Sequence, residues 1–176
     1  MKSYIFYFVF FLLLYGYGCG YTTRAVNYKE QRIYISPVVN KINITYESRA
    51  YSSYNSYPVL LEKRLTNALV EKFNVDGHLS VSPDKEGALR LVCEIKDYRK
   101  EALRYTDNDE VTEQRLRLYV HIVLYGSEGD KLKEKDIIGE TTYVLSGARR
   151  KTESSAQVDL VNDTARRIVD SVVEEW

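Results

Sequence analysis

The residue types that most often carry out chemistry are sparse in this sequence and do not form a catalytic or metal-binding group. There are two histidines, His78 and His121, and neither stands at metal-ligand spacing from another histidine, cysteine or acid. No nucleophile motif and no glycine-rich phosphate loop is present. We therefore predict a protein that is not an enzyme and that has no metal site and no cofactor.

One thiol stands where covalent modification is chemically plausible. Cys19 lies between two glycines and follows an uncharged run, Tyr4–Tyr15, that begins just after Lys2. A membrane-spanning helix needs about 20 apolar residues, so this shorter run indicates a secretory signal peptide over residues 1–18. Cleavage before Cys19 would leave an N-terminal cysteine, and the pattern resembles a bacterial lipoprotein signal, in which that thiol receives acyl chains such as palmitate. The alternative is an ordinary cleaved signal with a leftover thiol, which would need a separate explanation in an exported chain.

The densest cationic run in the chain is Arg149-Arg150-Lys151. Arginine bonds phosphates and carboxylates through two parallel N–H groups, so anion binding is the chemistry that this run offers. The competing interpretation is solvated surface, which is the usual role of a charged run. Over the whole chain 25 basic residues balance 25 acidic ones, so the net charge does not indicate a nucleic-acid partner.

The elements that position these residues follow from periodicity. Residues 19–31 contain the modified cysteine and a polar, aperiodic tether. The segment 32–39 predicts a first strand near a sheet edge, because Pro37 cannot donate a ladder hydrogen bond. The stretch 40–57 is a polar connection rich in tyrosine and serine, and 78–82 predicts a short strand.

Two helices and three long strands complete the pattern. The first helix has Ser56 as its cap, Pro58 in its first turn and its end at 74–77. It carries apolar residues at every fourth position: Leu61, Leu65, Leu69 and Phe73. The second helix begins near Ser154 and has apolar residues at spacings of three and four: Val158, Val161, Ala165, Ile168, Val172 and Trp176. The long strands show alternation through Leu89, Leu91, Cys93 and Ile95, through Leu116, Leu118, Val120, Ile122 and Leu124, and over 137–145.

This order predicts an α+β fold. Each strand has one apolar side and each helix one apolar stripe, so a two-layer sandwich buries all of them together. We predict two helices packed on one face of a mixed, mostly antiparallel sheet of about four strands, in a single domain over residues 32–176. Cys93 is predicted to be a small buried core residue.

Several segments also occur in the order typical of a known family. They are GCGY at 18–21, SPVVNKIN at 36–43, LEKRLTNALVEKF at 61–73, the region 88–124 and the last helix. The most specific is EALRYTDNDEVTEQRLRL at 101–118. Over essentially the whole mature chain the sequence resembles the lipopolysaccharide-assembly outer-membrane lipoproteins (LptE-like).

The resemblance implies a lipoprotein anchored by its N-terminal lipid at the periplasmic face of the outer membrane. Such a protein plugs the LptD-like β-barrel that inserts lipopolysaccharide, supports the assembly of that barrel, and binds lipopolysaccharide during its transport to the outer leaflet. The resemblance also implies contacts to lipopolysaccharide in a hairpin that holds Arg99, Lys100 and Arg104, and in the loop before the last helix. The candidate ligand-binding residues are Arg104, Arg149, Arg150 and Lys151.

A second interpretation belongs to another functional class. Small α/β outer-membrane lipoproteins also act as protein-only scaffolds or activators of a cell-wall synthase. Such a protein needs a disordered linker long enough to cross the periplasm. The tether before Arg32 is about a dozen residues long, which favours work at the membrane itself.

Overall fold

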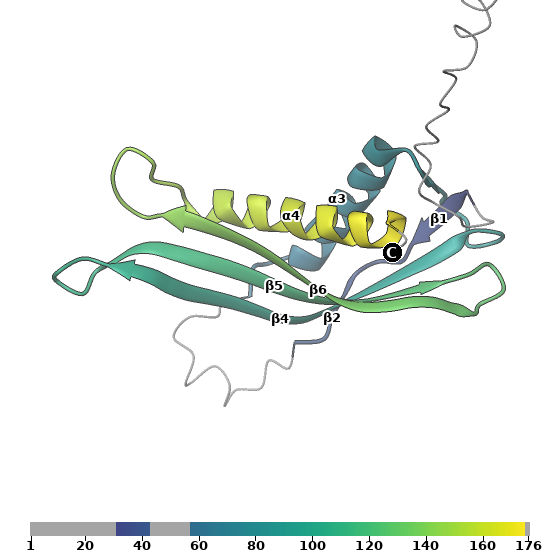
Figure 1. The fold of residues 1–176 in the computed structure, drawn as a ribbon, viewed down its shortest axis with the longest axis horizontal. Coiled ribbons are helices and arrows are strands. Elements are labelled where there is room, and N and C mark those ends of the chain that lie inside the picture. Colours follow the sequence, from purple (N-terminus) through teal and green to yellow (C-terminus); the bar gives the residue numbers. More distant parts are fainter. Residues whose placement is uncertain (1–30, 43–56, 175–176) are drawn as a thin grey trace, which may run out of the picture.

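The computed structural model describes residues 31–42 and 57–174 of this 176-residue chain. Cys19, the predicted signal peptide, nearly all of the predicted tether, most of the stretch 40–57 and Trp176 lie outside the described residues. Two helices cover one face of a six-stranded sheet (Figure 1). The predicted α+β sandwich with two helices on one face of a mixed sheet is confirmed, although the sheet has six strands rather than about four.

Three long antiparallel strands make up most of the sheet. They are β4 (Leu89–Tyr105), β5 (Val111–Tyr125) and β6 (Lys131–Val144). The strand order is β3-β1-β4-β5-β6. The short strand β2 lies off this path and pairs with β4. The short strands β1 (Arg32–Ile35), β2 (Val39–Asn40) and β3 (Ser80–Val81) all pair in parallel.

The predicted first strand over 32–39 is wrong in one respect, since it is divided into β1 and β2. Pro37 lies at the break and has no N–H to donate. The Val38 N–H donates to the hydroxyl of Thr66 in the first helix at 3.1 Å instead of to a neighbouring strand. This division accounts for one of the additional strands.

The first helix, α3 (Leu61–Asp76), begins later than predicted. Its N-cap is Leu60, which has a left-handed φ of 58° and provides no side-chain cap, so Pro58 precedes the helix instead of lying in its first turn. The proposed cap Ser56 lies outside the described residues. The helix end is as predicted, because Gly77 has a φ of 74° and its N–H donates to the Phe73 carbonyl at 3.1 Å.

The second helix, α4 (Glu153–Val173), begins within one residue of the predicted position and is capped by Thr152, whose hydroxyl accepts from the Ser155 N–H at 3.2 Å. Val161, Ala165, Ile168 and Val172 are buried as predicted, but Val158 is 48% exposed. Ala156 and Leu160 face the sheet in its place, because residues four apart lie on the same side of a helix.

Alternation along the strands defines the core. On β5 the side chains of Leu116, Leu118, Val120, Ile122 and Leu124 are at most 1% exposed, and they lie on the face that the helices cover. Cys93 is buried in the same core, and burial raises the pKa of its thiol to about 12. This thiol is therefore a packing group and not a nucleophile.

The long strands extend further than the apolar alternation indicates. Arg99, Lys100 and Arg104 lie within β4, where the resemblance implies a hairpin. The charged run 131–136 lies within β6, ahead of the predicted strand at 137–145. Charged residues remain in these strands because cross-strand pairs compensate them. Arg117 of β5, for example, lies 3.4 Å from Glu101 of β4 and 3.3 Å from Glu140 of β6.

Candidate functional site

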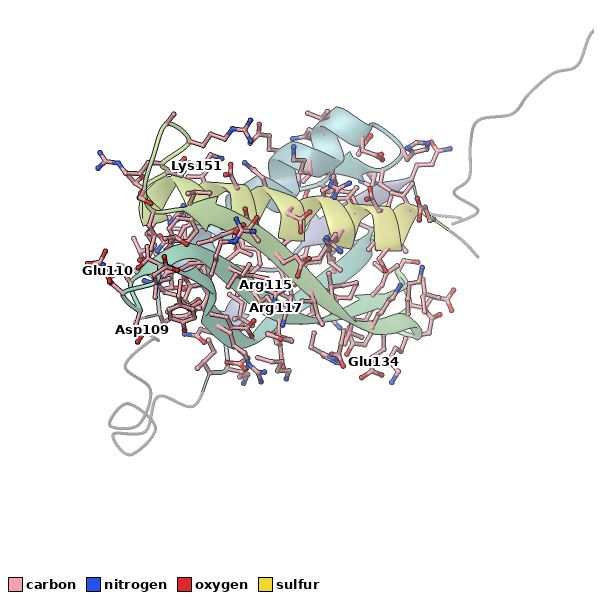
Figure 2. The ribbon with its side chains drawn as sticks, turned by 60° about the vertical axis from the view of Figure 1, so that its left-hand side comes forward. Asp109, Glu110, Arg115, Arg117, Glu134 and Lys151 are labelled. Carbon is pink, nitrogen blue, oxygen red and sulfur yellow. The ribbon has the colours of Figure 1, made fainter. Side chains whose placement is uncertain are left out.

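The predicted ligand-binding residues lie at one end of the sandwich. The Leu145 N–H donates to the Thr112 carbonyl at 2.9 Å, so the end of β6 lies beside the start of β5. Figure 1 shows the β4–β5 hairpin and the β6–α4 connection at the same end of the molecule, and Figure 2 shows Lys151 at the end that carries Asp109 and Glu110. We call residues 103–113 and 145–152 together the hairpin end.

Residues 145–152, which include Arg149, Arg150 and Lys151, form the basic loop, and hydrogen bonds hold its backbone against the sheet. The chain turns at Gly147, whose φ of 84° is one that glycine adopts readily. The Arg150 N–H then donates to the Gly147 carbonyl at 3.2 Å, and the Lys151 N–H donates to the Val144 carbonyl of β6 at 2.9 Å. The loop therefore presents its cationic side chains from a defined backbone, directly before the cap of α4.

The four cations of the hairpin end differ in how far they are neutralised. Lys151 lies 2.5 Å from Asp159, and Arg104, which is 75% exposed, lies 3.5 Å from Glu113. Arg149 and Arg150 are exposed and form no ion pair with any other residue of 31–42 and 57–174. These two guanidinium groups are therefore the most available anion-binding groups of the hairpin end.

The other two cations of the predicted hairpin contacts do not join this group. Lys100 points to the helix layer and lies 2.5 Å from Glu153 of α4, with only 21% of its side chain exposed. Arg99 lies 2.6 Å from Asp97, and its guanidinium is 4.9 Å from the ring centroid of Tyr119. Both have structural partners, so of these three cations only Arg104 has a largely exposed side chain.

Sequence reasoning missed Tyr105 as a neighbour of Arg104. Arg104 pairs with Glu113 and Tyr105 pairs with Val111, with register shifts on both sides of Arg104. Since Glu113 and Val111 are two residues apart on β5, their partners share one face of the sheet, although Arg104 and Tyr105 are consecutive. Simple alternation places consecutive residues on opposite faces, so no sequence signal could have found this pair.

The tip of the hairpin carries the opposite charge. Asp107, Asp109 and Glu110 lie in the turn between β4 and β5, which is closed by a 2.8 Å hydrogen bond from the Thr106 N–H to the Glu110 carbonyl. These carboxylates repel an anion that approaches along the hairpin. The basic loop is accordingly the part of the hairpin end that attracts one.

Within the described ranges, no group of three or more histidine, cysteine, aspartate or glutamate side chains is placed to bind a metal ion. No helix in the part of the chain that the structure covers is long and apolar enough to cross a membrane.

A sequence profile described as "LptE: Lipopolysaccharide-assembly" matches residues 31–175. The chain belongs to this lipopolysaccharide-assembly family. Members of the family act in assembly and are not enzymes, which confirms the corresponding prediction from the sequence.

Solved structures resemble the chain at low sequence identity, whereas no curated protein sequence matches it. The solution structure of a protein called uncharacterized lipoprotein B from Nitrosomonas europaea is 15% identical, has a TM-score of 0.52 and aligns over 81% of each chain. Rare lipoprotein B from Shewanella oneidensis is 14% identical with a TM-score of 0.47, over 78% of this chain and 92% of that one. A minor lipoprotein from Acinetobacter baumannii is 17% identical with a TM-score of 0.45, over 81% and 91%. The Nitrosomonas structure supports the two-layer fold.

Proposed function

We propose that this chain is an outer-membrane lipoprotein, anchored at the periplasmic face through an acylated Cys19. In this proposal it plugs the LptD-like β-barrel that inserts lipopolysaccharide, supports the assembly of that barrel, and binds lipopolysaccharide on its way to the outer leaflet. Membership of the lipopolysaccharide-assembly family supports the role in assembly. The observation that carries the binding role is the pair Arg149 and Arg150, two exposed guanidinium groups without an acidic partner in the described ranges.

Charge chemistry links this pair to the ligand. The head and core of lipopolysaccharide carry phosphates or carboxylates, and a guanidinium group bonds either through parallel N–H donors. Arg104 lies on β4 at the same end of the molecule. Only β5 separates β4 from β6, so the backbones of β4 and β6 are about 10 Å apart. Side chains from both segments can therefore reach one headgroup.

The half of the open sheet face that lies nearer the hairpin end suits burial inside a polar barrel lumen. Moving an unpaired charge out of water costs more free energy than moving a charge that already has an oppositely charged partner. On this face Arg115 and Arg117 both lie 3.4 Å from Glu101, and Arg117 also pairs with Glu140. The lumen of large outer-membrane barrels is polar, so such a face can lie against it.

The binding role is tested with the variant Arg149→Glu/Arg150→Glu of the full-length protein in detergent. The matched control is Lys63→Glu/Lys135→Glu, which changes the net charge equally at two exposed positions outside the hairpin end. Each charge-assisted bond contributes about 1.5–3 kcal/mol, so loss of one true contact should weaken lipopolysaccharide binding about tenfold or more. The control should bind like wild type, and the melting temperatures should agree. Wild-type affinity in the arginine variant would contradict the binding role.

The assembly role is tested by affinity purification from detergent-solubilised envelopes. We expect a large β-barrel protein to be recovered in a 1:1 ratio with the chain. Recovery of a cell-wall synthase without a barrel would contradict the proposal and support the scaffold interpretation.

A further inference from the structure

A second cationic cluster lies on the open face of the sheet, near the end opposite to the hairpin end. Tyr34 of β1 pairs in register with Arg90 of β4, and Arg90 pairs in register with Tyr125 of β5. Their chain neighbours Ile33, Leu89 and Leu124 are buried on the side of the helices. Alternation therefore places Tyr34, Arg90 and Tyr125 side by side on the uncovered face. Together with Lys85 we call them the tyrosine–cation row.

The cations of the row lie over aromatic rings. The Arg90 Cζ is 4.4 Å from the ring centroid of Tyr125, and the Lys85 Nζ is 5.3 Å from that of Tyr34. A cation in this position is attracted by the ring face. The N–H groups of arginine lie in the plane of the guanidinium, so stacking on a ring leaves them available to an acceptor.

The row also lacks compensating acids. Neither Arg90 nor Lys85 forms an ion pair with another side chain in the described ranges. This distinguishes Arg90 from the other stacked arginine of the same face, since Arg99 has Asp97 at 2.6 Å. At the row the open face therefore presents positive charge together with half-buried tyrosine rings.

We propose that the tyrosine–cation row binds a phosphorylated sugar in the saccharide part of lipopolysaccharide. The guanidinium of Arg90 binds the phosphate, and the ammonium of Lys85 adds positive charge to the row. The parts of the two tyrosine rings that the cations leave uncovered, with backbones about 10 Å apart, pack against the sugar. This inference rests on the proposed function. It adds a contact point distinct from the hairpin end, because Arg90 and Arg104 are 14 residues apart on one strand, or about 45 Å.

The experiment uses the full-length protein in detergent and the phosphorylated core oligosaccharide released from lipopolysaccharide by removal of its acyl chains. The test variant is Arg90→Gln, and the matched control is Arg99→Gln, which removes a ring-stacked arginine from the same face where an acid already neutralises it. We expect Arg90→Gln to weaken binding of the oligosaccharide about tenfold, while Arg99→Gln stays within about twofold of wild type. Enzymatic removal of the phosphates from the probe should weaken its binding to wild type by a similar factor.

Equal binding by wild type and Arg90→Gln would overturn the proposal, as would an equal loss in both variants or full affinity for the phosphate-free probe. Failure of the row is distinguishable from failure of the proposed function. If intact lipopolysaccharide binds through Arg149 and Arg150 and the barrel is recovered while Arg90→Gln has no effect, only the row is refuted. If intact lipopolysaccharide binds to no form of the protein, the proposed function itself fails.

Discussion

Replacing Gly139 by alanine should separate helix α4 from strand β6. A Cβ at this position would lie 1.9 Å from the Thr164 Oγ1, 2.7 Å from the Thr164 Cβ and 2.9 Å from the Thr164 Cα. Thr164 is completely buried, and its hydroxyl donates to the Leu160 carbonyl at 2.7 Å, so rotation of this side chain does not relieve the clash. The distance from the new methyl group to the backbone of Thr164 has to lengthen to about 3.5 Å or more, and this requires α4 to move away from β6.

The expected loss of stability follows from two contributions. Overpacking of a well-packed core destabilises by about 1–3 kcal/mol. Movement of α4 also stretches the hydrogen bond in which the Glu140 N–H donates to the Asp163 carboxylate at 3.0 Å, and bonds to a charged group contribute about 1.5–3 kcal/mol. If about half of that bond is lost, Gly139→Ala should lower the free energy of unfolding by about 2–4 kcal/mol, which corresponds to a decrease in melting temperature of about 5–15 °C.

Urea unfolding followed by circular dichroism measures this loss. The double variant Gly139→Ala/Thr164→Ala provides the control, because it removes the clash with the Thr164 hydroxyl but leaves the close approach to the Cβ and backbone of residue 164 in place. We therefore expect partial rescue, with a coupling free energy of about 1 kcal/mol. An unfolding free energy for Gly139→Ala within about 0.5 kcal/mol of wild type would refute the close packing of α4 on β6.

Three further predictions follow from single residues. Leu118→Asp places an unpaired charge beneath the helices and should lower the free energy of unfolding, measured in denaturant, by several kcal/mol. Tyr119→Asp on the open face should destabilise the fold much less. A tolerated Leu118→Asp would mean that the face assignment is reversed. Burial raises the pKa of Asp163, but the Glu140 N–H and two arginines outweigh this and lower the pKa below its usual value. The carboxylate's stabilising contribution is therefore complete above the unfolded pKa of about 4 and is lost as the pH falls through the lower folded pKa. The difference in unfolding free energy between wild type and Asp163→Asn should be constant above about pH 5 and shrink in acid. A difference that grows in acid would contradict a lowered pKa for Asp163. Cys19→Ala should abolish labelling by a clickable fatty acid and leave a heavier precursor, and equal labelling of both proteins would end the lipoprotein interpretation.

The sequence by itself determined the layers of this protein. Alternation on β5, through Leu116, Leu118 and Val120, assigns the buried face correctly because side chains of a strand point to opposite sides in turn. Gly77 marks the end of α3, since glycine accepts the left-handed conformation of a C-cap. The cationic run at 149–151 is likewise evident from the sequence alone, because the density of charge along a chain does not depend on how the chain folds.

Tertiary structure decided which of those cations remain available. Pairing of Lys151 with Asp159 and of Lys100 with Glu153 depends on how α4 packs against the loop and the sheet, and no local pattern records such contacts. The extension of β4 through Tyr105 depends on its partners in β5. The apolar alternation is lost after Ile95, and this loss wrongly indicated that the strand ends there. The juxtaposition of Tyr34, Arg90 and Tyr125 likewise requires three strands from distant parts of the chain to align in register. Sequence periodicity reports which side of its own strand a residue occupies, whereas its neighbours across the sheet are set only by the pairing of strands.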